Sequence, residues 1–267
     1  MKAHCLIREQ PWYRRDAFKG GLAAAGHEVV LSPPDRPSPE TLLVIWNRYS
    51  TNHELALRVE RAGGRVLVAE NGYIGKGGGT PKFQVHPAGP QPGHYYAIGL
   101  RFHNDETCIN WGTTSRFDAL AVELKPWRVG DHILVAPNRS FGIPERMMHP
   151  DWGERCVARL RKQTKRPIIL RTHPGNNEPR RALSEDLKGA HAVYVWSSSC
   201  GVHALAEGIP TFVEAPYWIM KSASARGDIE SPVLPERKPA FERLAWAQWT
   251  CEEIASGLPF RTLLPTA

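Results

Sequence analysis

Buried strands alternate with amphipathic helices along the first part of the chain. Continuous apolar runs predict the strands, because a strand covered on both faces of a parallel sheet has no polar side to alternate with. Apolar residues at helical spacing predict helices over 12–26 and 51–63, each ending at glycine. The predicted strands are 2–9, 27–32, 41–48 and 65–70. Such alternation indicates an α/β protein with a parallel, doubly wound sheet.

The pattern stops over residues 71–94, which hold seven glycines and four prolines. A loop of this length inside a compact domain is usually functional or mobile. Residues 95–104 return to order, and strands and helices alternate again from about residue 126. The predicted strands are 132–138, 167–175, 192–196 and 210–216, and the predicted helices are 151–165, 181–188 and 239–257. Two βαβ-type domains, 1–125 and 126–267, follow from this pattern.

Length and composition agree with two small globular domains. The chain has 267 residues, 42% hydrophobic and 23% charged. No apolar run approaches the roughly 20 residues that span a bilayer, and the amino-terminal stretch turns charged too early for a signal peptide. Five scattered cysteines form no CxxC pair, so neither a disulfide framework nor a zinc site is predicted. We therefore expect a reduced, cytoplasmic protein with no membrane partner.

The formal net charge is +7 at pH 7. Arginine is spread along the whole chain, so arginine-rich coding explains the charge without any function. The alternative is a polyanionic partner, either a nucleotide diphosphate or a nucleic acid.

Two short stretches follow buried strands in the second half. They read RTHPG (171–175) and SSSCGVHALAEGIPTF (197–212). Ligands of open α/β sheets bind at the carboxyl ends of the strands, and the N–H groups at a helix start bind anions. Gly201 would let the backbone approach such a ligand. The pair predicts an anion site, and the simpler alternative is an N-capped helix of an ordinary α/β domain.

Several common patterns are absent from the sequence. It contains no GxxxxGK[ST], which argues against P-loop hydrolysis of ATP or GTP. No GxGxxG follows the first strand and no GxSxG is present, so a classical NAD fold and an α/β-hydrolase are disfavoured. The eleven histidines show no HxxxH or HExxH spacing, so no metal pattern supports a catalytic ion.

The segment RTHPG…AVYVWSSSCGVHALAEGIPTFVEAP resembles the sugar-nucleotide half of GT-B glycosyltransferases of the capsule and phage-encoded types. The stretches IREQPWYRRDAF, VIWNRY, VAENGYIG, ELKPWR and LAWAQWTCEEIASG are similar to small phage and prophage proteins. The resemblance implies two Rossmann-like domains facing a cleft, with a C-terminal helix that crosses back to the N-terminal domain. The retaining enzymes carry a Glu-x7-Glu pattern, with seven residues between the two glutamates. This chain departs from it because only six residues separate Glu207 from Glu214.

The resemblance implies a donor site for a nucleotide-diphospho-sugar in the second half. Arg139, Arg171 and His173, together with the helix start, would stabilise the departing diphosphate. The predicted donor-binding residues are Arg139, Arg171, His173, Pro174, Gly175, Trp196, Ser197, Ser198, Ser199, Gly201, Val202 and Glu214.

A single inverting displacement needs a base that takes the proton of the acceptor hydroxyl. Glu70, at the end of its predicted strand, is the first candidate, and His103 and Asp105 are the alternatives. Structural roles compete with these predictions, because Glu70 could cap the following turn and His103 could be a satisfied structural histidine.

Basic and aromatic residues are interleaved in REQPWYRR (8–15) and WNRY (46–49), at predicted strand ends or helix starts. Such a mixture suits a nucleic-acid backbone and an unstacked base, and an enzyme that modifies a base in duplex DNA must extrude it. A solvated basic face over core aromatics is the alternative. Trp246 and Trp249 are expected to be core residues. The predicted acceptor-binding residues are Arg8, Tyr13, Arg14, Asn47, Arg48, Asn71 and Tyr73.

These observations predict a glycosyltransferase that moves a sugar from a UDP-sugar to 5-hydroxymethylcytosine or 5-hydroxymethyluracil in phage double-stranded DNA, in the host cytoplasm. A Mg²⁺ ion associated with the diphosphate is compatible with this prediction. Two alternatives stay open: a transferase for capsule or lipopolysaccharide glycan, and a non-catalytic nucleotide- or DNA-binding module.

Overall fold

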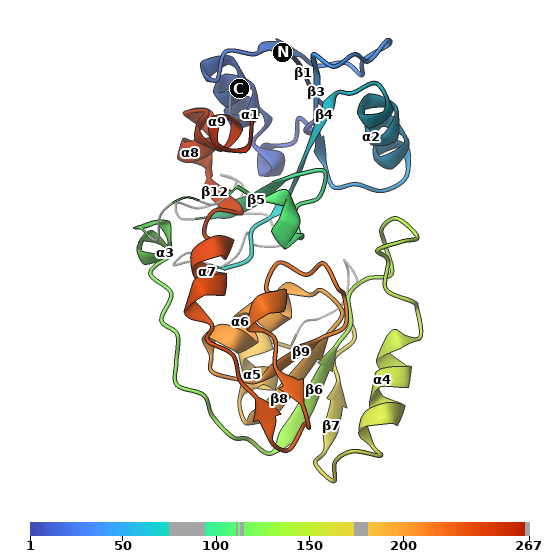
Figure 1. The fold of residues 1–267 in the computed structure, drawn as a ribbon, viewed down its shortest axis with the longest axis vertical. Helices are drawn as coiled ribbons and strands as arrows, with labels where there is room; N and C mark the ends of the chain where they lie inside the picture. Colours follow the sequence, from blue (N-terminus) through green and yellow to red (C-terminus); the bar gives the residue numbers. More distant parts are fainter. Residues whose placement is uncertain (75–93, 111, 113–114, 174–180, 265–267) are drawn as a thin grey trace. The chain divides into compact units, whose positions relative to one another are not determined.

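The computed structural model describes residues 1–74, 94–110, 112, 115–173 and 181–264. The chain divides into two units (Figure 1): unit 1 contains Met1–Ala121 and Arg243–Ala267, and unit 2 contains Val122–Glu242. The sequence pattern had placed all of 126–267 in the second domain. The resemblance had implied that the C-terminal helix crosses back to the N-terminal domain, and the last segment, Arg243–Ala267, does belong to unit 1.

A six-stranded sheet forms the centre of unit 1, in the order β12-β5-β4-β3-β1-β2. The β1–β2, β1–β3 and β3–β4 pairs are parallel, as predicted, whereas β5 runs antiparallel to both β4 and β12. The sheet is therefore parallel on one side and antiparallel on the other. Its strands are β1 (Lys2–Cys5), β2 (Glu28–Val30), β3 (Thr41–Trp46), β4 (Arg65–Asn71), β5 (Tyr95–Leu100) and β12 (Gln248–Thr250).

Helices cover both faces of this sheet (Figure 1). Helices α1 (Arg15–Ala24), α8 (Cys251–Ala255) and α9 (Leu258–Leu263) pack together on one face, over a core that includes Phe18, Trp249 and Phe260. Helix α2 (Thr51–Arg61) contacts β3 and β4 from a second core that contains Ile45 and Val68. Unit 1 also contains η1 (Pro11–Tyr13), η2 (Glu106–Cys108) and α3 (Ser115–Leu120).

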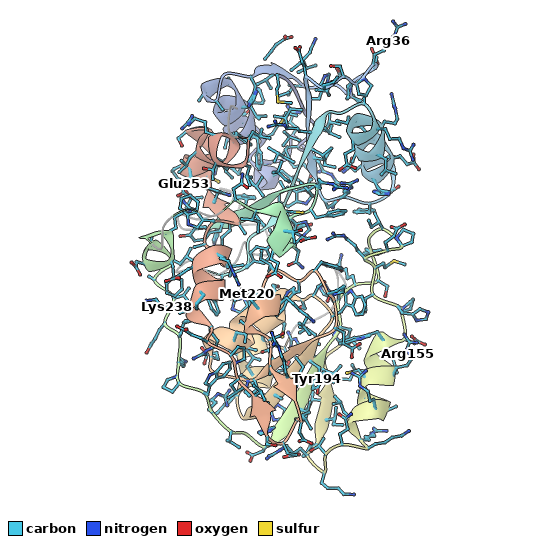
Figure 2. All side chains as sticks on the ribbon, viewed as in Figure 1. Arg36, Arg155, Tyr194, Met220, Lys238 and Glu253 are labelled. Atoms are coloured by element: carbon cyan, nitrogen blue, oxygen red, sulfur yellow. The ribbon has the colours of Figure 1, made fainter. Side chains whose placement is uncertain are left out.

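Unit 2 contains a four-stranded, fully parallel sheet in the order β7-β6-β8-β9. Helix α4 (Trp152–Leu160) packs against β6 and β7, and α6 (Ser199–Ala206) packs against β8 and β9. Tyr194 in β8, labelled in Figure 2, stacks on Phe212 in β9. Their ring centroids are 4.6 Å apart. The strands are β6 (His132–Ala136), β7 (Ile168–Leu170), β8 (Ala190–Val195) and β9 (Thr211–Val213). The remaining elements are α5 (Leu183–Leu187), η3 (Lys221–Ala223), β10 (Arg226–Gly227), β11 (Pro232–Val233) and α7 (Lys238–Leu244).

The parallel strands of both units follow the same order. In unit 1 the order is β2-β1-β3-β4, and in unit 2 it is β7-β6-β8-β9. In each sheet the second strand pairs with one edge of the first strand, and the third strand pairs with the opposite edge. The point where the order reverses, between β1 and β3 or between β6 and β8, leaves a crevice at the carboxyl ends of the strands, where ligands of such sheets bind.

The prediction of one long helix over 239–257 is wrong. The segment forms α7, the edge strand β12 and the short helix α8. The buried amide of Gln248 accepts backbone hydrogen bonds from Tyr73 and Ile74, at 2.8 and 3.2 Å, and donates one to the Ile74 carbonyl. Thr250 and Glu253 then form a capping box that starts α8. These contacts hold the segment extended at the edge of the sheet.

Candidate functional site

The crevice of the unit 2 sheet is closed by a side chain that the sequence did not single out. Asn138 follows β6 and Ser197 follows β8. The Asn138 Nδ2 group donates to Ser197 Oγ at 3.2 Å, and the Ser197 backbone N–H donates to Asn138 Oδ1 at 3.1 Å. These bonds join the two loops at the switch point of the sheet. The only signal in the sequence is the position of Asn138, directly after a buried strand and a proline.

A pocket of about 550 Å³ lies beside this junction, wholly within unit 2. Its volume falls in the range of about 300–1,000 Å³ that small-molecule sites occupy. Two predicted donor residues line it, and they contact each other: Arg139 Nε donates to His173 Nδ1 at 3.3 Å. The lining residues are Pro137, Asn138, Arg139, Ser140, Phe141, Met148, Pro150, Gly153, Glu154, Leu170, Thr172 and His173.

The chemistry of this pocket suits a phosphorylated, hydroxyl-rich ligand. Arg139 provides a guanidinium whose planar N–H groups match phosphate oxygens. Ser140 and Thr172 contribute hydroxyls, and Glu154 contributes a carboxylate that can accept from a sugar hydroxyl. The rim of the pocket includes Phe141, which is 70% exposed. The loops after β6 and β7 and the start of α4 thus bring a guanidinium, two hydroxyls and a carboxylate to one pocket.

The serine-rich loop behaves partly as the simpler alternative predicted. Ser198 is the N-cap of α6, and its Oγ accepts from the Cys200 N–H at 3.2 Å. Ser199 is exposed at the first position of the helix. Gly201 does not provide a ligand approach, because a Cβ there would lie 2.8 Å from the buried Trp218 ring. Val202 is also fully buried, so neither residue is available to a donor.

Arg171 is held away from a free phosphate-binding role. Its guanidinium forms an ion pair with the buried Asp186 and donates to the Arg181 carbonyl at 2.9 Å. Arg181 pairs with the same carboxylate at 3.1 Å. The function of Arg171 in the structure is therefore to fix α5 beside β7. Pro174 and Gly175, also predicted donor residues, lie outside the described residues.

Glu214 and Trp196 are engaged by the protein in the same way. Glu214 forms an ion pair with Arg159 and accepts from Trp152 Nε1 at 2.6 Å. The indole N–H of Trp196 donates to the Arg146 carbonyl at 3.1 Å. Both side chains are thus held by other parts of unit 2. A donor that binds Glu214 or Trp196 would have to displace these hydrogen bonds and the ion pair.

The three predicted base residues gather around Tyr73 in unit 1. The Tyr73 hydroxyl donates to the His103 carbonyl at 2.5 Å. Burial raises the pKa of Tyr73 well above its ordinary value, and the charges of Glu70 and Asp105 add to the shift. Glu70 Oε1 accepts from the Asn71 N–H at 2.9 Å, the turn-capping contact that the sequence left open. The structure thus brings Glu70, His103 and Asp105 close together.

Asp105 is a poor candidate for the base. Its carboxylate is buried and is the N-cap of η2, accepting from the Thr107 N–H at 2.9 Å and from Thr107 Oγ1 at 2.6 Å. A buried cap cannot exchange protons with an acceptor without losing these bonds. Glu70 and His103, both half-buried, stay as predictions.

Four of the predicted acceptor residues lie at the switch point of the unit 1 sheet. Arg8 donates to the Tyr13 hydroxyl at 3.2 Å, and the Tyr13 ring packs edge-on against Trp46 at 4.8 Å. Arg14 and Asn47 both have left-handed backbones, with φ of 51° and 53°. Such conformations are uncommon for non-glycine residues and cluster at functional sites. Arg8, Arg14 and Asn47 stay as predicted ligand contacts, while Tyr13 is buried and supports Arg8.

Arg48 is a structural residue, contrary to the prediction. It is buried and pairs with Glu60 through two hydrogen bonds of 2.7 Å. The same guanidinium donates to His53 Nδ1 and the Arg101 carbonyl, and packs on the Phe102 ring at 4.6 Å. Its donors are consumed within unit 1, so it cannot also bind an acceptor.

Asn71 leaves one polar atom unused. Its Oδ1 is buried without a hydrogen-bond partner in the described part of the chain. A buried acceptor of this kind costs free energy unless a ligand or water pairs with it. Asn71 therefore stays a predicted acceptor contact, although Tyr73 is buried and its hydroxyl is already engaged.

The described residues contain neither a metal site nor a membrane-spanning helix. No group of three or more His, Cys, Asp or Glu side chains there could hold a metal ion. No helix in those same parts of the chain has the length and apolar character to cross a bilayer.

Comparisons with known proteins identify the fold. No family model and no curated protein sequence matches the chain. Two solved structures from Thermosulfurimonas dismutans are similar over nearly the whole chain. The KpsC beta Kdo 2,4 transferase has a TM-score of 0.52 at 15% identity and covers 92% of this chain and 90% of its own. The KpsC beta Kdo 2,7 transferase has a TM-score of 0.55 at 13% identity. The match covers 96% of this chain and 98% of the transferase chain. The chain therefore has the two-unit, Rossmann-like α/β fold of GT-B glycosyltransferases, as the sequence resemblance implied.

Proposed function

We propose that this protein is a glycosyltransferase that takes a sugar from a nucleotide-sugar donor and transfers it to a glycan of the capsule or lipopolysaccharide type. The observation that carries the proposal is the pocket beside Asn138 and Ser197. It lies at the carboxyl ends of β6 and β7, next to the switch point of the unit 2 sheet, and contains Arg139 and His173. The same fold in two Kdo transferases supports this choice of reaction.

The donor would bind with its phosphates against Arg139 and the loop hydroxyls. In the reaction, the bond between the anomeric carbon and the phosphate oxygen breaks and a bond to the acceptor oxygen forms. The phosphate leaves with the electron pair, so negative charge grows on the oxygen that Arg139 would contact. Groups aimed at developing charge stabilise the transition state more than the ground state.

The acceptor hydroxyl loses its proton during transfer. We propose Glu70 or His103 as the base, since both are half-buried titratable residues in the Tyr73 cluster. Asp105 is omitted because it is a buried helix cap. A divalent ion bound with the donor phosphates stays compatible with this proposal.

A glycan acceptor fits the chain better than DNA. The DNA prediction relied on a basic and aromatic cluster in unit 1, and two of its members are committed elsewhere. Arg48 is paired with Glu60, and Tyr13 is buried against Trp46. A polar sugar chain needs fewer cations and more hydroxyl partners than a phosphate backbone does.

The experiment is a transfer assay with two variables, donor and acceptor. Donors are UDP-activated hexoses and nucleotide-activated Kdo, and acceptors are Kdo oligosaccharides and duplex DNA with or without 5-hydroxymethylcytosine. We expect product only with the glycan. Product on hydroxymethylated DNA would restore the DNA-modification prediction. The absence of both sugar transfer and donor hydrolysis with every donor–acceptor pair would contradict the proposal.

Matched variants connect the activity to the pocket. Arg139→Ala should lower kcat/KM by about 10- to 100-fold, the worth of a charge-assisted hydrogen bond. Arg155→Ala is the control, because Arg155 is an exposed cation of the same unit that projects from the outer side of α4 and pairs with Asp151 (Figure 2). Equal activity of both variants would place the donor elsewhere.

A further inference from the structure

A second pocket lies at the opposite edge of the unit 2 sheet. It measures about 540 Å³ and is lined by residues 161–166 and Glu230. These residues follow α4 and precede β7, so they lie at the amino edge of the sheet, whereas the donor pocket follows the carboxyl ends of β6 and β7. The two pockets are therefore separate, and the proposed transfer does not use this one.

The second pocket is strongly basic. Arg161, Lys162 and Lys165 are exposed, and no acidic side chain in the described part of the chain pairs with them. The single lining carboxylate, Glu230, is already bound by Thr164 and by Arg166 at 2.9 Å. The hydrogen bond from Thr164 lowers the pKa of Glu230 most. Desolvation opposes it, and the hydrogen bond and charge of Arg166 lower the pKa further, so Glu230 stays ionised and paired.

A helix C-terminus does not account for this charge. One cation near the last turn satisfies the helix dipole, and the effect falls off within that turn. Arg159 already occupies the last turn of α4, although its guanidinium pairs with Glu214. Three further unpaired cations beyond the end of the helix repel one another and need a separate explanation.

Two exposed aliphatic side chains belong to the segments that contact the basic pocket. Val129 and Val233 are 77% and 66% exposed, among the most exposed large apolar side chains described. Both neighbour residues that hold the pocket together. Arg166 Nη1 donates to the carbonyl of Gly130, next to Val129, at 2.6 Å. Glu230 lies in the turn of the β10–β11 hairpin, which Val233 ends. Acidic Asp131 and Asp228 are also exposed at this edge, outside the pocket lining.

We propose that this surface, formed by residues 161–166, Val129 and the β10–β11 hairpin, docks on an anionic phospholipid bilayer. The cations would face lipid phosphates, and the two valines would enter the interfacial region. Clustered lysine and arginine residues bind anionic lipid with roughly additive strength, and apolar side chains strengthen such contacts. The docking is peripheral and reversible. It adds a peripheral membrane contact that the sequence did not lead us to expect.

The test is co-sedimentation of the full chain with vesicles of phosphatidylcholine, with and without about one third phosphatidylglycerol. We expect binding only to the anionic vesicles, with release at about 1 M salt, where the Debye length is about 3 Å. The triple variant Arg161→Ala/Lys162→Ala/Lys165→Ala should bind on the order of 100-fold more weakly, at roughly fivefold per cation.

A charge-matched control separates a docking surface from general attraction. Arg36, Arg61 and Arg65 are exposed cations of unit 1, and Arg36 projects from the tip of its loop (Figure 2). The variant Arg36→Ala/Arg61→Ala/Arg65→Ala removes the same charge and should keep vesicle binding. Equal loss in both triple variants, or binding to neutral vesicles alone, would overturn the proposal.

The aliphatic contribution has its own variant. Val129→Ser/Val233→Ser leaves the charge unchanged and should weaken binding at intermediate salt, where the electrostatic part is screened. Unchanged binding at all salt concentrations would remove the valines from the docking surface. Thermal unfolding measured on every variant shows whether the fold of unit 2 is retained.

Discussion

The variant Arg48→Met is expected to destabilise unit 1 by about 3 kcal/mol. Arg48 has 3% of its side chain exposed, and its partner Glu60 has 18% exposed. Removal of one partner from a buried ion pair costs about 3–5 kcal/mol, because the other charge stays buried without compensation. The low end applies here, since the Arg101 guanidinium stays 3.2 Å from the Glu60 carboxylate.

The assay is thermal unfolding followed by calorimetry. About 3 kcal/mol corresponds to a decrease in Tm of about 6–12 °C for a domain of this size. Arg101→Met is the matched control: Arg101 contacts the same carboxylate but is 66% exposed, so its loss should cost below about 1 kcal/mol. The double variant Arg48→Met/Glu60→Leu should recover part of the loss, because no charge is then left buried.

The pH dependence gives a second readout. Burial alone would raise the pKa of Glu60, but the hydrogen bonds and charges of Arg48 and Arg101 outweigh it and lower the pKa below 4.5. A carboxyl with a lowered folded-state pKa contributes stability above its unfolded pKa, and this stability disappears as the pH falls through the folded value. The difference between wild type and Arg48→Met should therefore shrink below about pH 4.5. A Tm unchanged at pH 7, with a raised acceptor KM, would refute the structural role and restore Arg48 to the acceptor site.

Three further predictions concern the core. Gln248→Leu should destabilise the protein by about 2–4 kcal/mol, because three buried backbone groups lose their partner; an unchanged urea midpoint would contradict this. Gly201→Ala should cost about 1–3 kcal/mol through overlap with Trp218. Gly20→Ala is the control, because its Cβ meets nothing within 4 Å and it should stabilise α1 by up to about 1 kcal/mol. Burial raises the pKa of the Cys156 thiol to about 12, so it should resist alkylation at pH 8 in the native state and react after denaturation; rapid native modification would show that the site opens.

The parallel core of each unit could be predicted from the sequence because it depends on local patterns. The apolar run over 41–46 can only be a buried strand, and Trp249 was expected in the core, where it is fully buried. The edge strand β12 could not be predicted, since its three residues lie within a helical apolar pattern. What makes it a strand is the contact of Gln248 with Tyr73 and Ile74, far away in the sequence.

The candidate site was predictable in location but only partly in membership. Loops after buried parallel strands meet at one edge, and this correctly brought Arg139 and His173 together. Residue type could not reveal which arginine is consumed by a partner. Arg171 pairs with Asp186, which follows it by fifteen residues, and Arg48 contacts the Arg101 carbonyl, which follows it by fifty-three. Asn138 was missed because its importance depends on Ser197, from another loop.

The most direct test of the account is calorimetric titration of the protein with UDP- and CMP-activated sugars, using wild type, Arg139→Ala and Arg155→Ala. The account predicts saturable binding of at least one donor. Arg139→Ala should weaken it about 10- to 100-fold, since a hydrogen bond to a charged group contributes about 1.5–3 kcal/mol, and Arg155→Ala should leave it unchanged. Binding unaffected by Arg139→Ala, or no binding of any nucleotide sugar, would contradict a donor site in the pocket at the carboxyl ends of β6 and β7.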